Sequence, residues 1–198
     1  MKNCFTICID MDDTIENLTS SWILWLNKKY DKNVHTTDLT SWGLNTVYPE
    51  LTDDQIYEPL MYREFWQTVT PKLDAVTYIQ KLIDEGQDIY ILTSAHHGTY
   101  KYKLEEVLFK HFPKIDRHKV IVAYAKQLIS CDILIDDGIH NMDSPNASYK
   151  LLFDTPHNQC PDVLETDFYR VKNWKEIYEI IHFLDYIYTK NKFETKMY

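Results

Sequence analysis

No stretch of this sequence is apolar for long enough to span a lipid bilayer. The apolar run near the N-terminus, Cys4 to Ile9, is too short for the core of a signal peptide, and carboxylates follow it directly. The chain also contains no internal repeat and no low-complexity tract. We therefore expect a cytoplasmic protein without a membrane partner.

Basic residues are few compared with acidic ones. Lysine and arginine together number 21, against 30 aspartates and glutamates, which gives a formal net charge of -9 at pH 7. This charge repels a nucleic-acid backbone, and the sequence has no local basic patch that would overcome the repulsion. A nucleic-acid polymer is therefore not an expected partner. A small anionic substrate is compatible with the charge if a bound divalent cation reverses the local field of the carboxylates.

The cysteines lack the close CxxC spacing of a zinc site. Three of them lie in or beside apolar runs that are typical of strands. We therefore expect reduced, buried thiols and no zinc. The four residues are Cys4, Cys8, Cys131 and Cys160.

The composition is that of a globular protein. Hydrophobic residues make up 44% of the 198 residues and aromatic residues 14%, which is enough to form a sizeable core. The length fits one domain with an insertion better than two independent domains.

Short apolar runs alternate with amphipathic segments along most of the chain. The runs predict buried strands at residues 4–9, 88–92, 120–122, 132–135 and 151–153. Helical periodicity is expected at residues 18–30, 71–86, 101–108 and 173–187, the last of these opened by a capping pair, Asn173 and Glu176. The mixed stretch from 31 to 70 reads as the rest of a helical insert. This alternation predicts an α/β fold with a mostly parallel sheet and helices on both faces.

Polar residues follow several of the expected strands. Asp10 follows the first, Thr93-Ser94 the second and Asp136-Asp137 the fourth, while Lys126 lies shortly after the third. Ligands of an open parallel sheet bind beyond the carboxyl ends of its strands, so we expect these groups to share one crevice. Carboxylates, hydroxyls and an ammonium group are the set that binds a phosphate together with Mg²⁺.

The segment Asp10-Met11-Asp12-Asp13-Thr14 resembles the DxDx[TV] motif of the haloacid dehalogenase-like (HAD) superfamily, and the other elements follow in that superfamily's order. The chain resembles in particular the 5'(3')-deoxyribonucleotidases, through this motif, Leu39-Thr40-Ser41-Trp42, Leu92-Thr93-Ser94, and Lys126 leading into Asp132-Ile133-Leu134-Ile135-Asp136-Asp137. The resemblance implies a Rossmann-like core at residues 1–15 and 71–198 and a helical cap at residues 16–70. It also implies a phosphomonoesterase that acts on deoxynucleoside monophosphates.

The reaction assigns roles to these residues. Asp10 is the expected nucleophile, which forms an aspartyl-phosphate, and Asp12, two residues on in an extended backbone, is the expected acid and base. Thr93, Ser94 and Lys126 are expected to bind the phosphate. By the resemblance, Asp10, the backbone carbonyl of Asp12 and Asp137 would hold Mg²⁺. Asp136 would be an outer partner or an alternative ligand.

Trp42 and Leu18 are the expected residues of the substrate pocket, although Trp42 fits a packing role between core and cap almost as well. Three positions depart from the family pattern: Asp13 replaces a glycine, Leu18 an aromatic residue, and Tyr124 an arginine. These departures leave the nucleobase preference open. We expect His96-His97 to be solvated and the aromatic residues of the insert, Trp22, Trp25, Phe65 and Trp66, to pack in a core rather than to stack on a nucleobase.

Three alternatives remain. The first is an enzyme that hydrolyses a non-nucleotide small phosphate ester. Faster hydrolysis of a sugar phosphate than of deoxynucleotides would indicate this alternative. A receiver-like phospho-acceptor would form a long-lived phosphoaspartate without releasing phosphate, but receivers are shorter and lack a cap. A non-catalytic binding protein would release no phosphate, with or without magnesium. The sequence leaves the oligomeric state open, a homodimer included.

Overall fold

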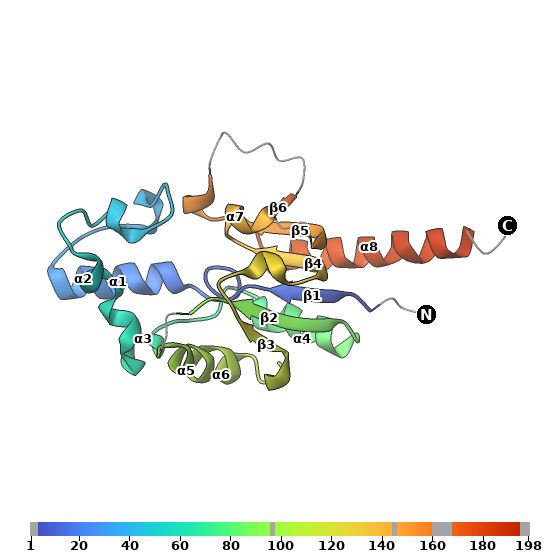
Figure 1. Cartoon of the computed structure of the whole chain (residues 1–198), viewed down its shortest axis with the longest axis horizontal. Helices are drawn as coiled ribbons and strands as arrows, with labels where there is room; N and C mark the ends of the chain where they lie inside the picture. Colours follow the sequence, from blue (N-terminus) through green and yellow to red (C-terminus); the bar gives the residue numbers. More distant parts are fainter. Residues whose placement is uncertain (1–3, 96–97, 144–145, 160–167, 195–198) are drawn as a thin grey trace.

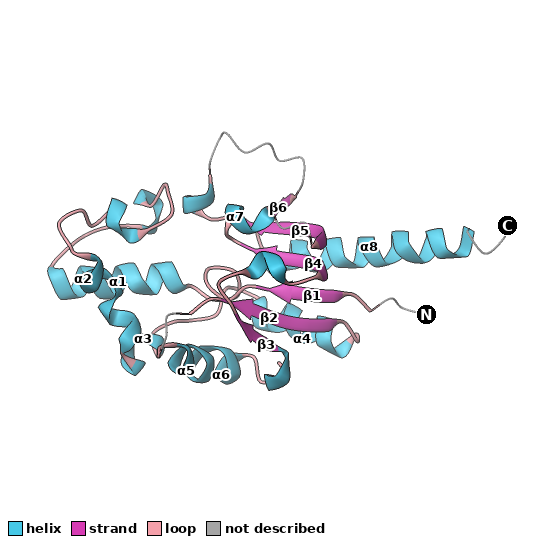
Figure 2. Cartoon of the chain, in the orientation of Figure 1, coloured by secondary structure: helices cyan, strands magenta, loops and turns pink. Residues whose placement is uncertain are grey.

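The computed structural model of the chain describes residues 4–95, 98–143, 146–159 and 168–194. A sheet occupies the middle of the molecule, and the strands run toward a group of helices at one end (Figures 1 and 2). These helices belong to residues 16–70, between the first strand and the next core helix, and are called the insert below. The carboxyl ends of the strands therefore face the insert.

The six strands are all parallel and lie in the order β3-β2-β1-β4-β5-β6. Their bounds are β1 Thr6–Ile9, β2 Asp88–Thr93, β3 Val120–Val122, β4 Cys131–Asp136, β5 Ala147–Phe153 and β6 Tyr169–Val171. The order reverses at the central strand β1, whose neighbours are β2 and β4. This reversal is where open α/β sheets bind their ligands.

Side chains alternate between the two faces of the sheet, so the core has two parts. Ile7 and Ile9 of β1 belong to the larger cluster, which helices α4 (Ala75–Asp84) and α8 (Trp174–Glu194) cover. Cys8, between them, points to the other face and joins a smaller cluster under α7 (Ile139–Met142). This places helices on both faces of the sheet, as the sequence predicted.

The helices differ widely in length. The insert holds α1 Leu18–Tyr30, α2 Asp53–Tyr57 and α3 Arg63–Trp66, with 3₁₀ turns at Thr36–Asp38, Leu44–Thr46 and Glu58–Met61. The core holds α4 Ala75–Asp84, α5 Tyr100–Tyr102, a π-helical segment Lys103–Leu108, α6 Phe109–His111, α7 Ile139–Met142 and α8 Trp174–Glu194, with 3₁₀ turns at Arg117–Lys119, Lys126–Leu128 and Pro156–Asn158.

Most predicted elements are confirmed, with three differences. The short edge strand β6 and the short helix α7 were not predicted. The helix expected from Pro71 begins only at Ala75, because Asp74 adopts a left-handed conformation with φ of 62°, and Leu73 is 87% exposed. The predicted capping pair of α8 is present, since the Glu176 N–H donates to the Asn173 side chain at 2.9 Å.

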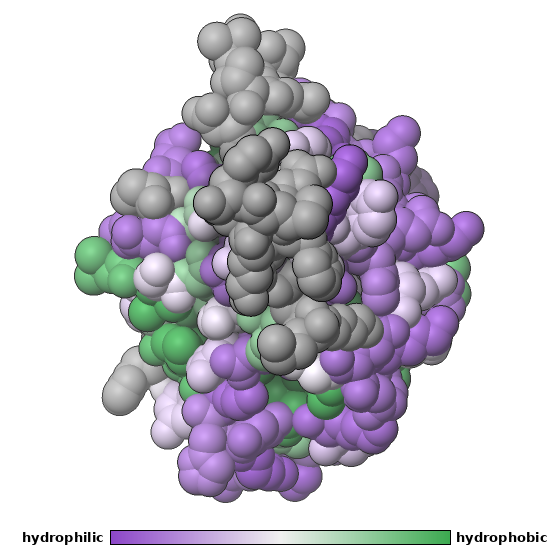
Figure 3. All heavy atoms as spheres, turned by 90° about the vertical axis from the view of Figure 1, so that its right-hand side faces the viewer, coloured by the Kyte–Doolittle hydropathy of each residue, from purple (hydrophilic) through white to green (hydrophobic). Residues whose placement is uncertain are grey.

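The end of the molecule that carries the chain termini is largely hydrophilic, with smaller apolar areas between the polar ones (Figure 3). No helix within the described residues combines the length and apolar character needed to cross a membrane.

Candidate active site

Three buried carboxyl groups meet where the sheet order reverses. Asp10 follows β1, Asp136 ends β4 and Asp137 comes next. The Asp10 N–H donates to the carbonyl of Ile135 at 2.9 Å, which fixes the end of β1 against β4. One oxygen from each carboxyl group lies within 4.8 Å of the other two. The sheet thus brings together the acids that the sequence placed at one crevice.

Lys126 inserts its ammonium group between two of these acids. Its Nζ lies 2.6 Å from Asp10 Oδ1 and 2.8 Å from Asp136 Oδ2, and all three side chains are buried. Burial alone would lower the pKa of Lys126, but Asp10 and Asp136 raise it above its ordinary value. Lys126 therefore stays positively charged between these two acids.

Lys126 does not by itself balance the acids around it. Burial raises the pKa of Asp10 to about 7; Lys126 opposes this rise, and Asp136 and Asp12 add to it. Burial and then the charges of Asp10, Asp13 and Asp136 raise the pKa of Asp137 well above its ordinary value. A divalent cation would relieve this repulsion, and an all-oxygen set of ligands suits Mg²⁺. The residues present therefore fit a magnesium site.

The hydrogen bonds of Asp136 separate its role from that of Asp137. Its Oδ2 accepts from Lys126, and its Oδ1 accepts from the Gly138 N–H at 2.8 Å and from Asn141 at 2.9 Å. A Cβ at Gly138 would lie 2.8 Å from Asn141 Nδ2, so a side chain there would displace the amide that donates to Asp136. Both oxygens of Asp136 are thus engaged by the protein, which favours an outer position relative to a bound cation.

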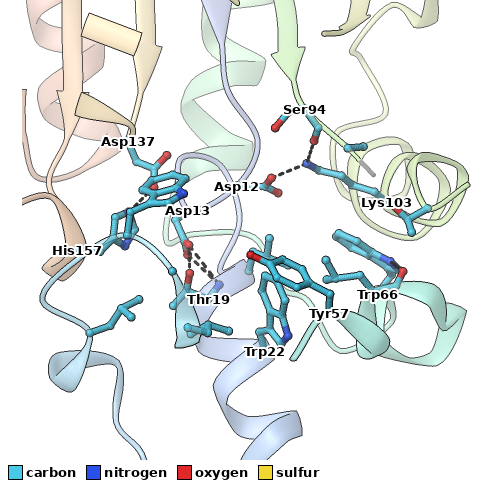
Figure 4. Close-up of a pocket in the computed structure, with 18 of the residues that line it drawn as sticks. Asp12, Asp13, Thr19, Trp22, Tyr57, Trp66, Ser94, Lys103, Asp137 and His157 are labelled. Carbon is cyan, nitrogen blue, oxygen red and sulfur yellow. Dashed lines mark hydrogen bonds and ion pairs between the residues drawn. The ribbon is translucent and has the colours of Figure 1, made fainter. Parts of the chain in front are cut away.

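A second lysine, which the sequence did not reveal, holds Asp12. Lys103 is only 1% exposed, and its Nζ lies 2.7 Å from Asp12 Oδ2, 2.7 Å from Thr93 Oγ1 and 2.9 Å from the Ser94 carbonyl (Figure 4). Asp10 and Asp12 therefore each have their own ammonium partner.

The π-helical segment from Lys103 to Leu108 accounts for this placement. Such widened turns are rare and are often found at functional sites. Lys103 contacts the strand ends, while Glu106 of the same segment accepts from Arg63 and Gln67 of the insert. One helix thereby joins the catalytic edge of the sheet to the insert. A lysine in an amphipathic helix gives no signal of this in the sequence.

Glu16 is a second residue that sequence reasoning missed. Its side chain is fully buried, and neither carboxyl oxygen has a hydrogen-bond donor among the described residues. Burial, followed by the charge of the neighbouring Asp12, raises the pKa of Glu16 well above its ordinary 4.5. The folded protein therefore favours the neutral form of Glu16.

Replacing Glu16 by methionine is expected to stabilise the metal-free protein by about 1–2 kcal/mol at pH 8, since it removes a buried and poorly satisfied polar group. The raised pKa stabilises the wild type below pH 4.5, and this contribution is lost as pH rises toward the folded-state pKa. The gain from the substitution should thus be smaller at pH 5 than at pH 8. Thermal unfolding with a chelator would measure it.

Glu64→Met is the matched control, because Glu64 is an exposed glutamate of the insert. Its stability should stay within about 0.5 kcal/mol of the wild type at both pH values. A Glu16→Met protein that is less stable than the wild type at pH 8 would contradict the expectation.

A cavity of about 320 Å³ opens between this group of residues and the insert (Figure 4). Leu18 and Trp42 line it, as do Trp22 and Trp66. The indole N–H groups of Trp22 and Trp66 donate to the Ile56 and Leu60 carbonyls, so these rings present apolar surface to the cavity. Other lining residues are Asp12, Asp13, Thr19, Leu39, Leu44, Tyr57, Leu60, Ser94, Thr99, Lys103, Tyr124, Asp137 and His157.

The remaining predicted positions lie as follows. Asp13 has φ of 51°, the left-handed conformation that a glycine adopts easily, and its carboxyl group accepts from Thr19. Trp25 and Phe65 pack edge-on within the insert, with ring centroids 5.7 Å apart. His96-His97 and Cys160 lie outside the described residues.

Comparisons with known proteins give consistent matches. The family model described as 5' nucleotidase, deoxy (pyrimidine), cytosolic type C protein matches residues 3–187. The 5'(3')-deoxyribonucleotidase of Bacillus subtilis (strain 168) is 34% identical over 173 residues, which cover 86% of this chain and 95% of that protein. A 5'(3')-deoxyribonucleotidase of Clostridium acetobutylicum is 30% identical over 172 residues, covering 86% and 91%.

Solved structures share the fold. A HAD family hydrolase from Deinococcus radiodurans R1, with bound phosphate and sodium, superposes with a TM-score of 0.61 at 12% identity, covering 89% of this chain and 94% of that one. A haloacid dehalogenase-like hydrolase from Streptococcus pneumoniae gives 0.59 at 14% identity, covering 90% and 98%. At these identities the likeness shows the fold alone.

Proposed function

Because the chain belongs to the cytosolic type C family of 5' deoxy (pyrimidine) nucleotidases, and is thus a phosphoric monoester hydrolase of the HAD superfamily, we propose that it is a magnesium-dependent 5'(3')-deoxyribonucleotidase of the cytosol. The observation that carries the proposal is the pair Asp10 and Asp12. They lie at the tip of the central strand, each beside its own buried lysine, and Asp12 also lines an apolar cavity.

The hydrolysis proceeds in two displacements. An oxygen of Asp10 bonds to phosphorus, the bond from phosphorus to the ester oxygen breaks, and Asp12 gives a proton to the departing oxygen. Asp12 then takes a proton from water, whose oxygen attacks phosphorus, and the aspartyl-phosphate bond breaks. Phosphate leaves and the Asp10 carboxylate is restored, so the same group serves as acid and then as base.

The chain's own residues prepare these steps. Lys126, which lies beside Asp10, would supply an ammonium group to the charge that develops on the phosphoryl oxygens, and the Thr93-Ser94 segment would supply hydroxyls and backbone N–H groups. Lys103 orients Asp12 toward the same space. Asp10, Asp137 and the backbone carbonyl of Asp12 would hold Mg²⁺, with Asp136 outside. Bound there, Mg²⁺ supplies positive charge that offsets the charge on the phosphoryl group.

The substrate's organic part occupies the cavity under the insert. We assign residues 16–70 as a cap that closes over the phosphate and excludes water, with residues 1–15 and 71–198 as the core. Leu18, Trp22 and Trp66 offer apolar surface that fits a nucleobase better than a polar sugar. This favours deoxynucleoside monophosphates over sugar phosphates, which are the second candidate substrates.

A phosphate-release screen over deoxynucleoside 5'- and 3'-monophosphates and sugar phosphates tests the proposal. We expect deoxynucleotides to be hydrolysed fastest, and removal of Mg²⁺ by a chelator to lower the rate at least about 10²-fold. A better sugar phosphate would overturn the substrate assignment while leaving the mechanism intact. Phosphate release that is insensitive to the chelator would overturn the metal assignment.

A further inference from the structure

His157 contacts the carboxyl group of Asp137, which lies near Asp10, the proposed nucleophile. It lies in the 3₁₀ turn Pro156–Asn158, which follows β5, and its Nε2 is 2.8 Å from Asp137 Oδ2. Asn158, the next residue, donates to the Asp137 carbonyl at 2.9 Å. This turn therefore holds both the side chain and the backbone of Asp137.

Trp42 of the insert packs against the same histidine. Its ring meets the ring of His157 edge-on, with centroids 5.0 Å apart and an interplanar angle of 86°. A second edge contact joins Trp42 to His140 of α7, at 5.2 Å and 83°. Trp42 is nevertheless 61% exposed, so it is not buried inside either part. Trp42 therefore bridges the insert to two core segments. Asn141, next to His140, donates to the Asp136 side chain, and Asn158, next to His157, donates to the Asp137 carbonyl.

We propose that His157 is a positioning residue for Asp137, and that Trp42 couples closure of the insert to cation binding through its contact with His157. The proposal rests on the proposed function for the identity of the cation site and for the closure of the insert. A donor on one oxygen of a ligating carboxylate fixes its rotation and leaves the other oxygen for the cation, and such outer partners commonly matter 10- to 100-fold in affinity. Because linkage is reciprocal, a contact that holds His157 also favours the cation, and the cation favours the closed insert.

Three substitutions separate the donor from the ring. His157→Phe keeps an aromatic ring for Trp42 but removes the donor, whereas His157→Gln keeps a donor but removes the ring. Trp42→Ala removes the contact from the other side. Mg²⁺ binding is measured by calorimetry on the metal-stripped full chain without substrate, because Trp42 also lines the substrate cavity.

We expect His157→Phe to weaken Mg²⁺ binding about 10- to 100-fold. Trp42→Ala should weaken it about 3- to 10-fold, in line with an edge-to-face contact. His157→Gln should match Trp42→Ala, and adding Trp42→Ala to either His157 variant should change little, because the chain of contacts is already broken. His118→Phe, at an exposed histidine of the core, is the matched control and should bind Mg²⁺ like the wild type.

Unchanged Mg²⁺ affinity in Trp42→Ala would overturn the coupling, and unchanged affinity in His157→Phe would overturn the positioning role. If His157→Phe does not fold, the comparison of His157→Gln with Trp42→Ala still decides the coupling: an additive double variant would overturn it. Failure of the proposed function would give a different result. The wild type would then release no phosphate from any ester, independently of the Mg²⁺ affinities of the variants.

Discussion

Asp10→Asn is expected to lower turnover of deoxynucleotides and of a generic aryl phosphate by at least about 10⁴-fold. The amide has nearly the same shape as the carboxyl group but is a poor nucleophile toward phosphorus. Lys126 keeps Asp136 as its charged partner in the variant, so the surrounding structure should persist. Steady-state phosphate release measures the loss. Acid quenching should trap a phosphorylated protein in the wild type and none in the variant.

Two controls make the result specific to the nucleophile. Asp53→Asn makes the same chemical change at an exposed position of the insert and should leave turnover unaltered. Mass measurement of the purified variant excludes conversion of the asparagine back to aspartate. Residual activity equal to that of the wild type, in a protein verified as the amide, would refute the assignment of Asp10.

The polar residues at the carboxyl ends of the strands were predictable because two local signals coincide there. Apolar β-branched runs identify buried strands, and the polar residue that ends each run marks the carboxyl end where ligands bind. Asp10, Lys126 and Asp136 therefore came together as expected from their positions alone. Parallel strands share one direction, so the order of strands in the sheet did not have to be known.

Lys103, Glu16 and His157 could not be found in this way, because each acquires its partner only through tertiary structure. Lys103 lies in a helix whose π-helical turn has no signature in the residue pattern. Glu16 reaches Asp12 only because the chain turns back, with Asp13 in a left-handed conformation. His157 lies in a short turn 20 positions after Asp137 in the sequence, and the two residues meet only in the folded chain.

The aromatic residues show a different limit. Core packing and a place in the substrate pocket were treated as alternatives for Trp22 and Trp66. In the structure both hold at once, because each ring is buried with its N–H bonded inside the insert while one part of its surface lines the cavity. Trp25 and Phe65, at similar spacing, pack edge-on against each other and do not line this cavity. Periodicity locates a buried face, but it does not say whether that face borders protein or cavity.

Asp12→Asn is expected to lower turnover of deoxynucleotides about 10²- to 10⁴-fold, because the amide can neither protonate the departing oxygen nor deprotonate water. The first of these losses depends on the substrate. A dinitrophenyl phosphate has a leaving group that departs without a proton, so formation of the aspartyl-phosphate should be nearly as fast as in the wild type. Its hydrolysis still needs the base and should remain slow.

The variant should therefore release about one equivalent of dinitrophenolate per protein in a rapid burst, followed by slow turnover. Stopped-flow absorbance measures the burst, and the trapped phosphoprotein gives an independent count. Lys103→Met, which removes the ammonium group that orients Asp12, should show the same selectivity for the activated ester with a smaller loss, about 10²-fold. A burst absent from Asp12→Asn, with equal losses on both esters, would move Asp12 from proton transfer to a purely structural or metal-holding role.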